Sequence, residues 1–193
     1  MASRADHSAE GIIVDGLSAL ADRATCVTAL RYFAENRAAN AIVQSFTGAS
    51  LPAPLTVVAA RGGRAPWGEE RRNRDRWILA WRSPTETWLL CANELEMTEL
   101  HARIGTLPDA CAVDQTGGIG VLRVRGERTA DLLVRLGSTA SVPALGEART
   151  SRIAELAVTA LRVQDDEILL LLDQAYADHL LGGIGATARD FPR

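Results

Sequence analysis

The chain contains no lysine, since all 21 of its basic side chains are arginine. A lysine amine is required to form a Schiff base with a carbonyl substrate. Lysine side chains also contact the phosphates in P-loop and kinase sites. The absence of lysine therefore excludes these reaction classes, whatever the fold.

An excess of charge of one sign is also missing. The 21 arginines are balanced by 24 acidic side chains, which gives a net charge of -3 over 193 residues. A protein that holds nucleic acid or an anionic membrane through its overall field needs a positive surface. We therefore expect neither of these partners.

Cysteine and histidine are scarce, with three residues of each type. No CxxC pair or other metal-ligand spacing occurs among them, so we expect no metal site. Cys91 and Cys111 lie within apolar stretches, where a cysteine is typically a small buried hydrophobic residue. The first 24 residues contain no apolar run of signal-peptide or membrane-spanning length. These features indicate reduced thiols and a cytoplasmic protein.

The 47% of hydrophobic residues is sufficient for one substantial core. Residues 1–24 are interpreted as an N-terminal arm with one short amphipathic piece at Leu17–Ala21, and 25–193 as a single compact domain. Within this domain, the segments 88–105 and 168–185 align without a gap, pairing Asn93 with Asp173 as candidate helix caps. The domain is therefore divided into two pseudo-repeats, 25–110 and 111–193.

Each pseudo-repeat has the predicted order βαββα. This order favours an α+β fold with two split-βαβ, ferredoxin-like halves and mainly antiparallel sheets. The first half has predicted strands Cys26–Tyr32, Trp77–Trp81 and Trp88–Cys91, a helix within 33–46 and a helix after Asn93; the second has strands Ile119–Arg125, Ile153–Val163 and Ile168–Leu172, the helix Glu127–Leu136 ended by Gly137, and a helix from Asp173.

Two glycine clusters invite a nucleotide-binding interpretation, at 116–120 and 181–185. A phosphate cradle requires a strand before the glycines and the N-terminus of a helix directly after them. The first cluster precedes a strand, and in the second Gly183 and Gly185 resemble C-terminal caps of a helix. The spacing therefore disfavours nucleotide binding.

A catalytic grouping of His101, Asp114 and Cys111 is conceivable, but the spacing does not require these residues to meet. His101 falls on the flank of a predicted amphipathic helix, where a solvated histidine is the ordinary case. Asp114 ends a predicted strand before two glycines, which suits a carboxylate that caps the turn. We therefore predict no catalytic, cofactor-binding or metal-ligating residue in this chain.

The segment 61–77 is unusual because it holds six arginines and three acids, and all four tryptophans lie in it or shortly after it. Arginine and tryptophan are enriched at the energetic centres of protein interfaces. We predict that this loop contacts a protein partner, although a merely solvated loop remains open and the acids weaken a nucleic-acid interpretation. The candidate contact residues are Trp67, Arg71, Arg72, Arg74 and Trp81.

Several segments resemble one known family. WILAWRSPTETWLLCANE (77–94) is similar to the W-L-G-P-D-E-W-L-L hairpin of the gamma subunits of heterotetrameric sarcosine oxidases, and it keeps Pro84 and Glu86. DACAVDQTGGIGVLRVRGERTADLLVRLG (109–137) resembles the segment that follows in that family. The resemblance runs from about Thr25 to Phe191.

The resemblance implies a fold related to the folate-binding aminomethyltransferase of glycine cleavage. It implies a small structural subunit without a cofactor of its own, in a complex that demethylates an amine such as sarcosine. FAD, FMN, NAD and tetrahydrofolate are then expected in the partner subunits, which are the larger alpha and beta subunits and, as an optional third partner, a delta subunit. The alternative is a free-standing folate-binding one-carbon transfer module, for which Asp114 or Glu155 would supply the carboxylate.

Overall fold

The structure is a computed structural model that describes residues 11–14, 17–21, 25–32, 57–59, 78–83, 86–91, 94–106 and 110–191. The described elements before residue 110 are β1 (Gly11–Val14), β2 (Leu17–Ala21), β3 (Cys26–Tyr32), β4 (Val57–Ala59), β5 (Ile78–Ser83), β6 (Glu86–Cys91) and α2 (Glu94–Ile104). Those that follow are β7 (Ala110–Asp114), β8 (Ile119–Arg125), α3 (Thr129–Leu136), η1 (Thr139–Ser141), β9 (Ala148–Ile153), β10 (Leu156–Gln164), β11 (Glu167–Asp173), η2 (Gln174–Tyr176) and α4 (Ala177–Arg189).

The strands form two sheets with corresponding strand orders. Sheet A has the order β1-β2-β8-β11-β10-β9, and sheet B has the order β4-β5-β6-β3-β7. If β8 is matched with β3, then β11, β10 and β9 match β6, β5 and β4. Every pair of neighbouring strands among the described residues is antiparallel. The predicted α+β class with mainly antiparallel sheets is therefore confirmed.

Each sheet contains one strand whose next neighbour in the chain belongs to the other sheet. β2 is directly followed by β3 in the chain but pairs with β8 in sheet A, whereas β7 is followed by β8 but pairs with β3 in sheet B. The chain therefore passes from sheet A to sheet B between Ala21 and Cys26, and from sheet B to sheet A between Asp114 and Ile119. This exchange ties the two halves together through backbone hydrogen bonds.

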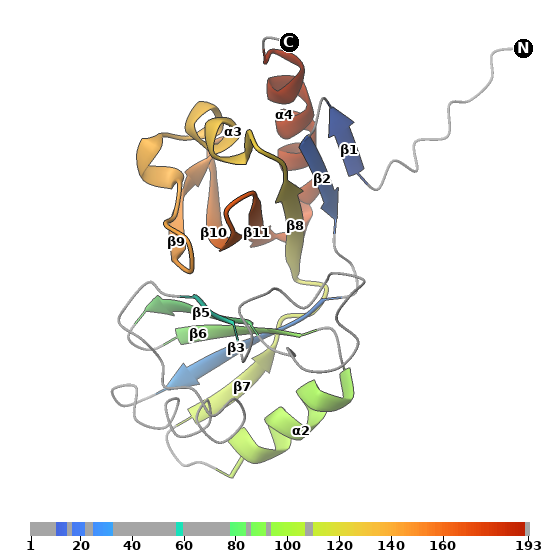
Figure 1. The fold of residues 1–193 in the computed structure, drawn as a ribbon. Helices are drawn as coiled ribbons and strands as arrows, with labels where there is room; N and C mark the ends of the chain where they lie inside the picture. Colours follow the sequence, from blue (N-terminus) through green and yellow to red (C-terminus); the bar gives the residue numbers. More distant parts are fainter. Residues whose placement is uncertain are drawn as a thin grey trace, which may run out of the picture.

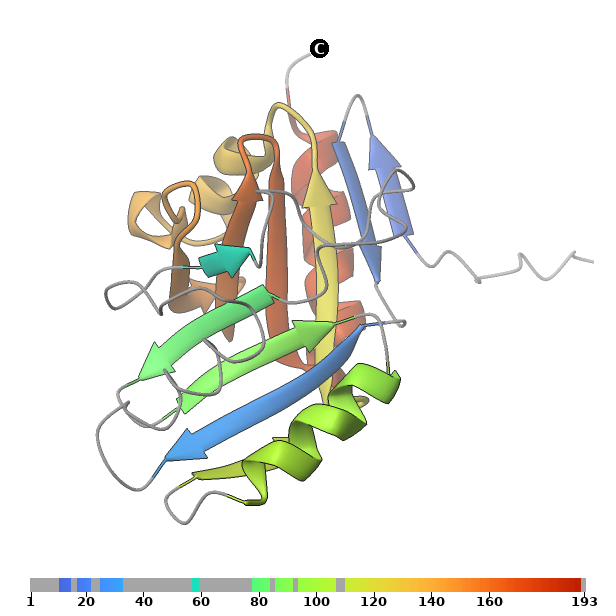
Figure 2. The ribbon, with the colours of Figure 1, turned by 60° about the horizontal axis from the view of Figure 1, so that its bottom comes forward.

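The layers run helix, sheet, sheet, helix, with α3 and α4 on sheet A and α2 on the far side of sheet B (Figure 1). Between the sheets lies a hydrophobic cluster to which both contribute. Val27, Ala29, Ile78, Ala80, Trp88 and Leu90 come from sheet B, and Val121, Ala148, Leu161, Leu169 and Leu171 from sheet A. Figure 2 shows the strands of the two sheets running crosswise.

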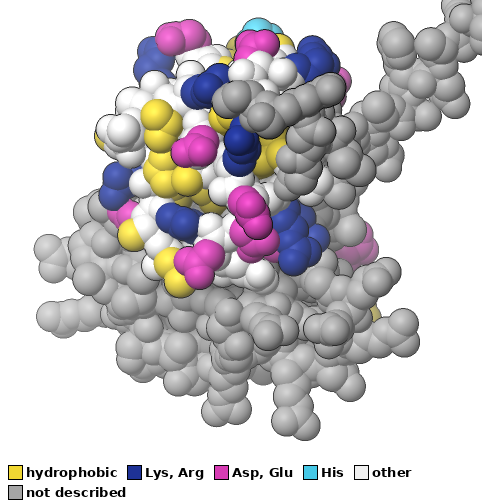
Figure 3. All heavy atoms as spheres, turned by 45° about the horizontal axis from the view of Figure 1, so that its top comes forward, with side chains coloured by type: hydrophobic (Ala, Val, Ile, Leu, Met, Phe, Trp, Pro, Cys, Tyr) yellow, Lys and Arg dark blue, Asp and Glu magenta, His cyan; other side chains and the backbone are white. Residues whose placement is uncertain are grey.

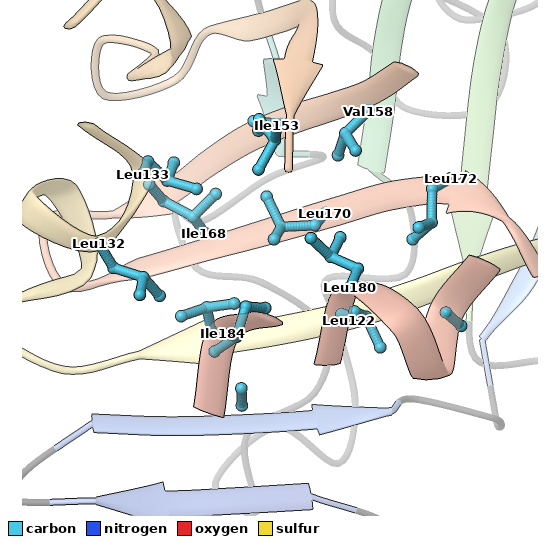
Figure 4. Packing of buried hydrophobic residues seen from close by; sticks show 14 of the residues in the cluster. Leu122, Leu132, Leu133, Ile153, Val158, Ile168, Leu170, Leu172, Leu180 and Ile184 are labelled. Carbon is cyan, nitrogen blue, oxygen red and sulfur yellow. The ribbon is translucent and has the colours of Figure 1, made fainter. Parts of the chain in front are cut away.

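A second cluster fills the space between sheet A and its helices. Figure 4 shows Leu132 and Leu133 of α3, and Leu180 and Ile184 of α4, pointing toward side chains of the sheet such as Leu170. All four of these helical residues are 0% exposed. β11 is thus buried on both faces, which explains its nearly continuous apolar sequence.

Three local predictions were wrong. The predicted strand Ile153–Val163 begins too early, because Ala154 and Glu155 adopt φ values of 48° and 65° and form the turn between β9 and β10, which begins at Leu156. Gly183 and Gly185 do not cap α4, which continues to Arg189 and buries Ala188. The amphipathic piece Leu17–Ala21 is not part of a free arm, because it is strand β2 on sheet A.

Other predictions were confirmed. α3 ends at Gly137. The Asp173 carboxylate caps η2 by accepting the N–H of Ala175 at 2.9 Å. The predicted helix within 33–46 lies outside the described residues.

Candidate functional site

The β5–β6 hairpin carries a charged cluster next to the space between the sheets. Trp81 pairs with Thr87 and Ser83 with Glu86, so Arg82 is an extra residue in a β-bulge. The Arg82 guanidinium lies 4.0 Å from the centre of the Trp88 ring. This cation–π contact holds the guanidinium against a buried indole.

Two arginines share the carboxylate of Glu86. Arg82 Nη1 donates to Oε1 at 2.6 Å, and Arg31 Nε donates to Oε2 at 3.0 Å. The Trp88 indole N–H also donates to Oε1 at 3.1 Å. Glu86 is thereby fixed with its side chain 17% exposed, while that of Arg31 is 55% exposed. The cluster carries one net positive charge and partly exposed guanidinium groups, which suits contact with an acidic partner surface.

The structure says little about the predicted contact residues. Trp67, Arg71, Arg72 and Arg74 lie outside the described residues. Trp81 is placed in β5 by its pairing with Thr87, and its side chain is outside the description. The sequence analysis did not identify Arg31 as part of this cluster, although its position in the strand indicates which face of the sheet it lies on. It follows Val27 and Ala29 at alternate positions, so it faces sheet A as they do.

The grouping of His101, Asp114 and Cys111 is only partly assembled. Thr28 is paired with Asp114, and its hydroxyl lies 2.8 Å from His101 Nε2, which places all three on the α2 side of sheet B. Cys111 is paired with Arg31, so it points to the opposite face of the sheet. A cysteine nucleophile at 111 is therefore not brought to this histidine.

The polar groups beneath α2 are held in structural roles. The Asp114 carboxylate accepts the Thr116 N–H at 2.8 Å, and this hydrogen bond holds the pKa of Asp114 below its ordinary value. The turn-capping role predicted for Asp114 is thus confirmed. Burial raises the pKa of the Cys26 thiol, and the carboxylates of Glu94 and Asp114 raise it further. A raised pKa keeps this thiol protonated and unreactive at neutral pH.

The glycine clusters do not form phosphate cradles in the structure. Gly117 has φ of +79° in the turn before β8, and the Gly118 N–H donates to the Gln115 carbonyl. The second cluster lies inside α4, where the backbone N–H groups take part in the helix. Neither cluster therefore has a strand before it and the N-terminus of a helix directly after it.

A pocket of about 270 Å³ lies at the end of β2 and the start of β8. Its described walls include Ala21 of β2, Thr25, Thr116 and Gly117 of the segment 115–118, and Gln174 of η2. The remaining lining residues are Ile119, Gly120, Val121, Leu122 and Ala177. Glu155, the second carboxylate proposed for a folate site, is not part of this wall; its side chain is 91% exposed and pairs with Arg152.

The face around α3 and α4 carries side chains of both charge signs between small hydrophobic patches (Figure 3). Among the described residues, the exposed large hydrophobic side chains include Val134 of α3, at 38% exposure, and Tyr176 of η2, at 51%. Within the described ranges, no three metal-ligating side chains lie together, and no helix has the length and apolar character needed to cross a membrane.

Comparison with known proteins gives a clear result only for structure. No protein-family model and no curated protein matches the sequence. A chain of the heterotetrameric sarcosine oxidase from Corynebacterium sp. U-96, in complex with pyrrole 2-carboxylate, superposes with a TM-score of 0.74 and 19% identity. The match covers 95% of this chain and 89% of that chain, so the two chains have similar lengths.

The glycine cleavage system aminomethyltransferase T from Bartonella henselae matches with a TM-score of 0.61 and 13% identity. This match covers 91% of the present chain but only 49% of the aminomethyltransferase, so the chain spans about half of that enzyme. The resemblance predicted from the hairpin and the following segments is thus confirmed as a likeness of fold.

Proposed function

We propose that the chain is a small structural subunit of a multi-subunit, flavin-dependent oxidase or dehydrogenase that demethylates an N-methyl amine such as sarcosine. The observation that carries this proposal is the fold shared with a chain of a heterotetrameric sarcosine oxidase over nearly the whole of both chains. A match of two short chains of similar length favours an equivalent place in an assembly over a fragment of a larger catalytic chain.

The β5–β6 hairpin supports the same proposal. The residues that resemble the sarcosine oxidase gamma signature, including Glu86 and Trp88, are those that organise the cluster with Arg31 and Arg82. A preorganised pair of arginines loses little side-chain entropy on binding, which favours contact with a partner. We assign this surface, together with Trp67, Arg71, Arg72, Arg74 and Trp81, to contacts with the larger alpha and beta subunits.

In this proposal FAD, FMN, NAD and tetrahydrofolate are bound by the larger subunits, as the family resemblance implies. The chain itself contributes assembly rather than chemistry. A cytoplasmic location belongs to the same proposal.

The test is affinity purification of the tagged chain from its own host, followed by native mass spectrometry and a visible spectrum. We expect two or more larger chains and flavin absorbance bands in the eluate. Elution of the chain alone and without colour would contradict the proposal. Full amine-oxidising activity in a host that lacks the chain would contradict a necessary structural role.

The docking surface is tested by the double variant Arg31→Gln with Arg82→Gln, because both changes keep side-chain length and remove charge. We expect less of the larger chains to be retained, and the difference from the native chain to shrink as the salt concentration rises, because salt screens the ion pairs of the native arginines. Arg152→Gln is the matched control, since Arg152 lies near the end of β9 and its side chain is 75% exposed. Equal retention of the larger chains by the double variant and the control would show that the hairpin cluster does not contribute to the interface.

The likeness to an aminomethyltransferase favours one second candidate, a free-standing folate-binding module. Asp114 and Glu155 do not converge, because Asp114 caps the turn after β7 whereas Glu155 lies in the β9–β10 turn. Titration of the isolated chain with a reduced folate separates the two candidates. Saturable binding that weakens in Asp114→Asn would favour the folate module, and no binding would favour the structural subunit.

A further inference from the structure

Cys26 and Cys91 lie directly opposite each other on neighbouring strands. Cys26 is the first residue of β3, Cys91 is the last residue of β6, and the two are partners in the antiparallel register. Both side chains therefore lie on one face of sheet B, the α2 side that also carries Thr28. Each is a thiol in the structure. The fold thus brings together two cysteines that are far apart in the sequence.

The spacing of paired strands suits a disulfide between these two residues. Directly opposite residues in an antiparallel pair have Cα atoms about 4.5 or about 5.5 Å apart, depending on the kind of pair. Disulfides join Cα atoms that are about 4.4–6.8 Å apart, so either kind of pair is compatible with an S–S bond. Cys111 is paired with Arg31 and lies on the opposite face of sheet B. It therefore cannot bond to either thiol in the folded chain.

The burial of the pair selects the oxidant. Cys26 is 6% exposed and Cys91 is 0% exposed. A small uncharged oxidant such as hydrogen peroxide needs little open surface, and Cys26 is the thiol that it reaches first. Burial and the carboxylates of Glu94 and Asp114 raise the pKa of the Cys26 thiol, so little of it is thiolate at neutral pH. Oxidation is therefore slow at neutral pH, and the pair stays reduced unless peroxide persists or the pH rises.

We propose that Cys26 and Cys91 form a redox modification site, where hydrogen peroxide converts the two thiols into a reversible cross-strand disulfide. The Cys26 sulfur attacks one oxygen of the peroxide, the O–O bond breaks, and the leaving hydroxide takes up the thiol proton, which gives a sulfenic acid and water. The Cys91 sulfur then attacks the Cys26 sulfur, the S–O bond breaks, and a second water leaves. The two thiols lose two electrons and two protons, and one peroxide takes up both and becomes two waters.

The disulfide would join two places at which the chain changes direction. The chain enters β3 from sheet A, and α2 begins at Glu94, shortly after Cys91. The bond therefore ties the crossing between the sheets to the start of α2. Because it also closes a long loop in the unfolded chain, the oxidised protein should unfold at a higher urea concentration than the reduced protein.

Peptide mapping after peroxide treatment tests the proposal. Cleavage at arginine places the three cysteines on separate peptides, 24–31, 83–103 and 104–123. The folded full-length chain is treated with hydrogen peroxide at mildly alkaline pH, then unfolded and alkylated before digestion. We expect a link between 24–31 and 83–103 that a dithiol reductant separates. A link to Cys111 in place of this one, irreversible oxidation of Cys26 without a link, or no oxidation of Cys26 would overturn the proposal.

Matched variants separate this pair from the third cysteine. Cys91→Ala should abolish both the link and the rise in the urea midpoint after peroxide treatment, whereas Cys111→Ala should leave both unchanged. A chain that is unfolded in urea before oxidation is the control for geometry, and there we expect links that include Cys111. The same distribution of links in the folded and the unfolded chain would overturn the proposal.

The pH dependence of the reaction tests its first step. Below the pKa of Cys26, the thiolate fraction rises about tenfold for each pH unit, and the rate of linking should rise in the same proportion. A rate that does not vary with pH would overturn the attack by the Cys26 thiolate. These measurements use the chain alone, so their outcome is independent of the function proposed above.

Discussion

The two sheets have corresponding strand orders, apart from the additional β1 of sheet A, but different contacts with their helices. Sheet A meets α3 and α4 through hydrophobic side chains, whereas sheet B meets α2 through a mixed surface that includes Thr28, His101 and Met97. The charged hairpin cluster also belongs to sheet B. Two sheets with the same pattern of strand pairing can therefore have different packing beneath their helices. The backbone pairing is shared, whereas the side chains differ and determine the stability and the chemistry of each half.

The largest loss of stability is expected from a substitution in the hydrophobic cluster between sheet A and its helices. Leu170 is 0% exposed in the central strand β11 and packs beneath α3 and α4. We expect Leu170→Ala to lower the free energy of unfolding by about 4 kcal/mol, measured by urea denaturation. Leu100→Ala on α2 should cost about 2–3 kcal/mol, because the surface beneath α2 is less uniformly apolar. Equal losses in the two variants would contradict the difference between the halves.

A second prediction concerns the polar contact beneath α2. Thr28 is 0% exposed, and its hydroxyl contacts His101 Nε2 at 2.8 Å and Met97 Sδ at 2.9 Å. Thr28→Val keeps the shape and leaves the histidine nitrogen without its partner, so we expect a loss of about 1–3 kcal/mol in unfolding free energy. Thr28→Ser retains the hydroxyl and should lose less. An unchanged stability in Thr28→Val would show that this hydrogen bond is dispensable.

The hairpin cluster should contribute less to stability than to binding. Arg82→Met keeps an aliphatic chain over Trp88 but loses the cation–π contact and the ion pair with Glu86. The Arg82 side chain is 32% exposed, so we expect a loss of about 1 kcal/mol in thermal or urea unfolding. Arg152→Met, which affects only a highly exposed pair, should change stability by less than about 0.5 kcal/mol. A larger effect of Arg152→Met would contradict this order.

The sequence predicted the elements that depend on local patterns. The helix ending at Gly137 and the cap at Asp173 were predicted because capping residues act within one turn. The strand at Leu17–Ala21 was missed because its partner β8 lies about a hundred residues later in the chain. The β9–β10 turn was missed because Ala154 and Glu155 adopt positive φ without glycine.

The candidate site was also less predictable, because its residues are brought together by pairing between strands that are distant in the sequence. Glu86 was recognised as part of a family-like hairpin, but its two arginine partners come from β3 and from the bulge in β5. Neither the register of β3 with β6 nor the bulge at Arg82 follows from the periodicity of the strands. The pocket likewise requires the exchange of β2 and β7, which no single segment encodes.

The smallest expected effect concerns pH and the turn that follows β7. The Thr116 N–H holds the pKa of Asp114 below its ordinary value of 3.8, so the ionised carboxylate stabilises the folded state above that value. This contribution is lost as the pH falls through the folded-state pKa. The free energy of unfolding of the native chain should therefore converge on that of Asp114→Ala between about pH 5 and about pH 2. Asp114→Asn keeps a neutral acceptor, so its difference from Asp114→Ala should not vary with pH. If the difference in unfolding free energy between the native chain and Asp114→Ala persists in acid, the charge of Asp114 is not what stabilises this turn, and the shape of the side chain is.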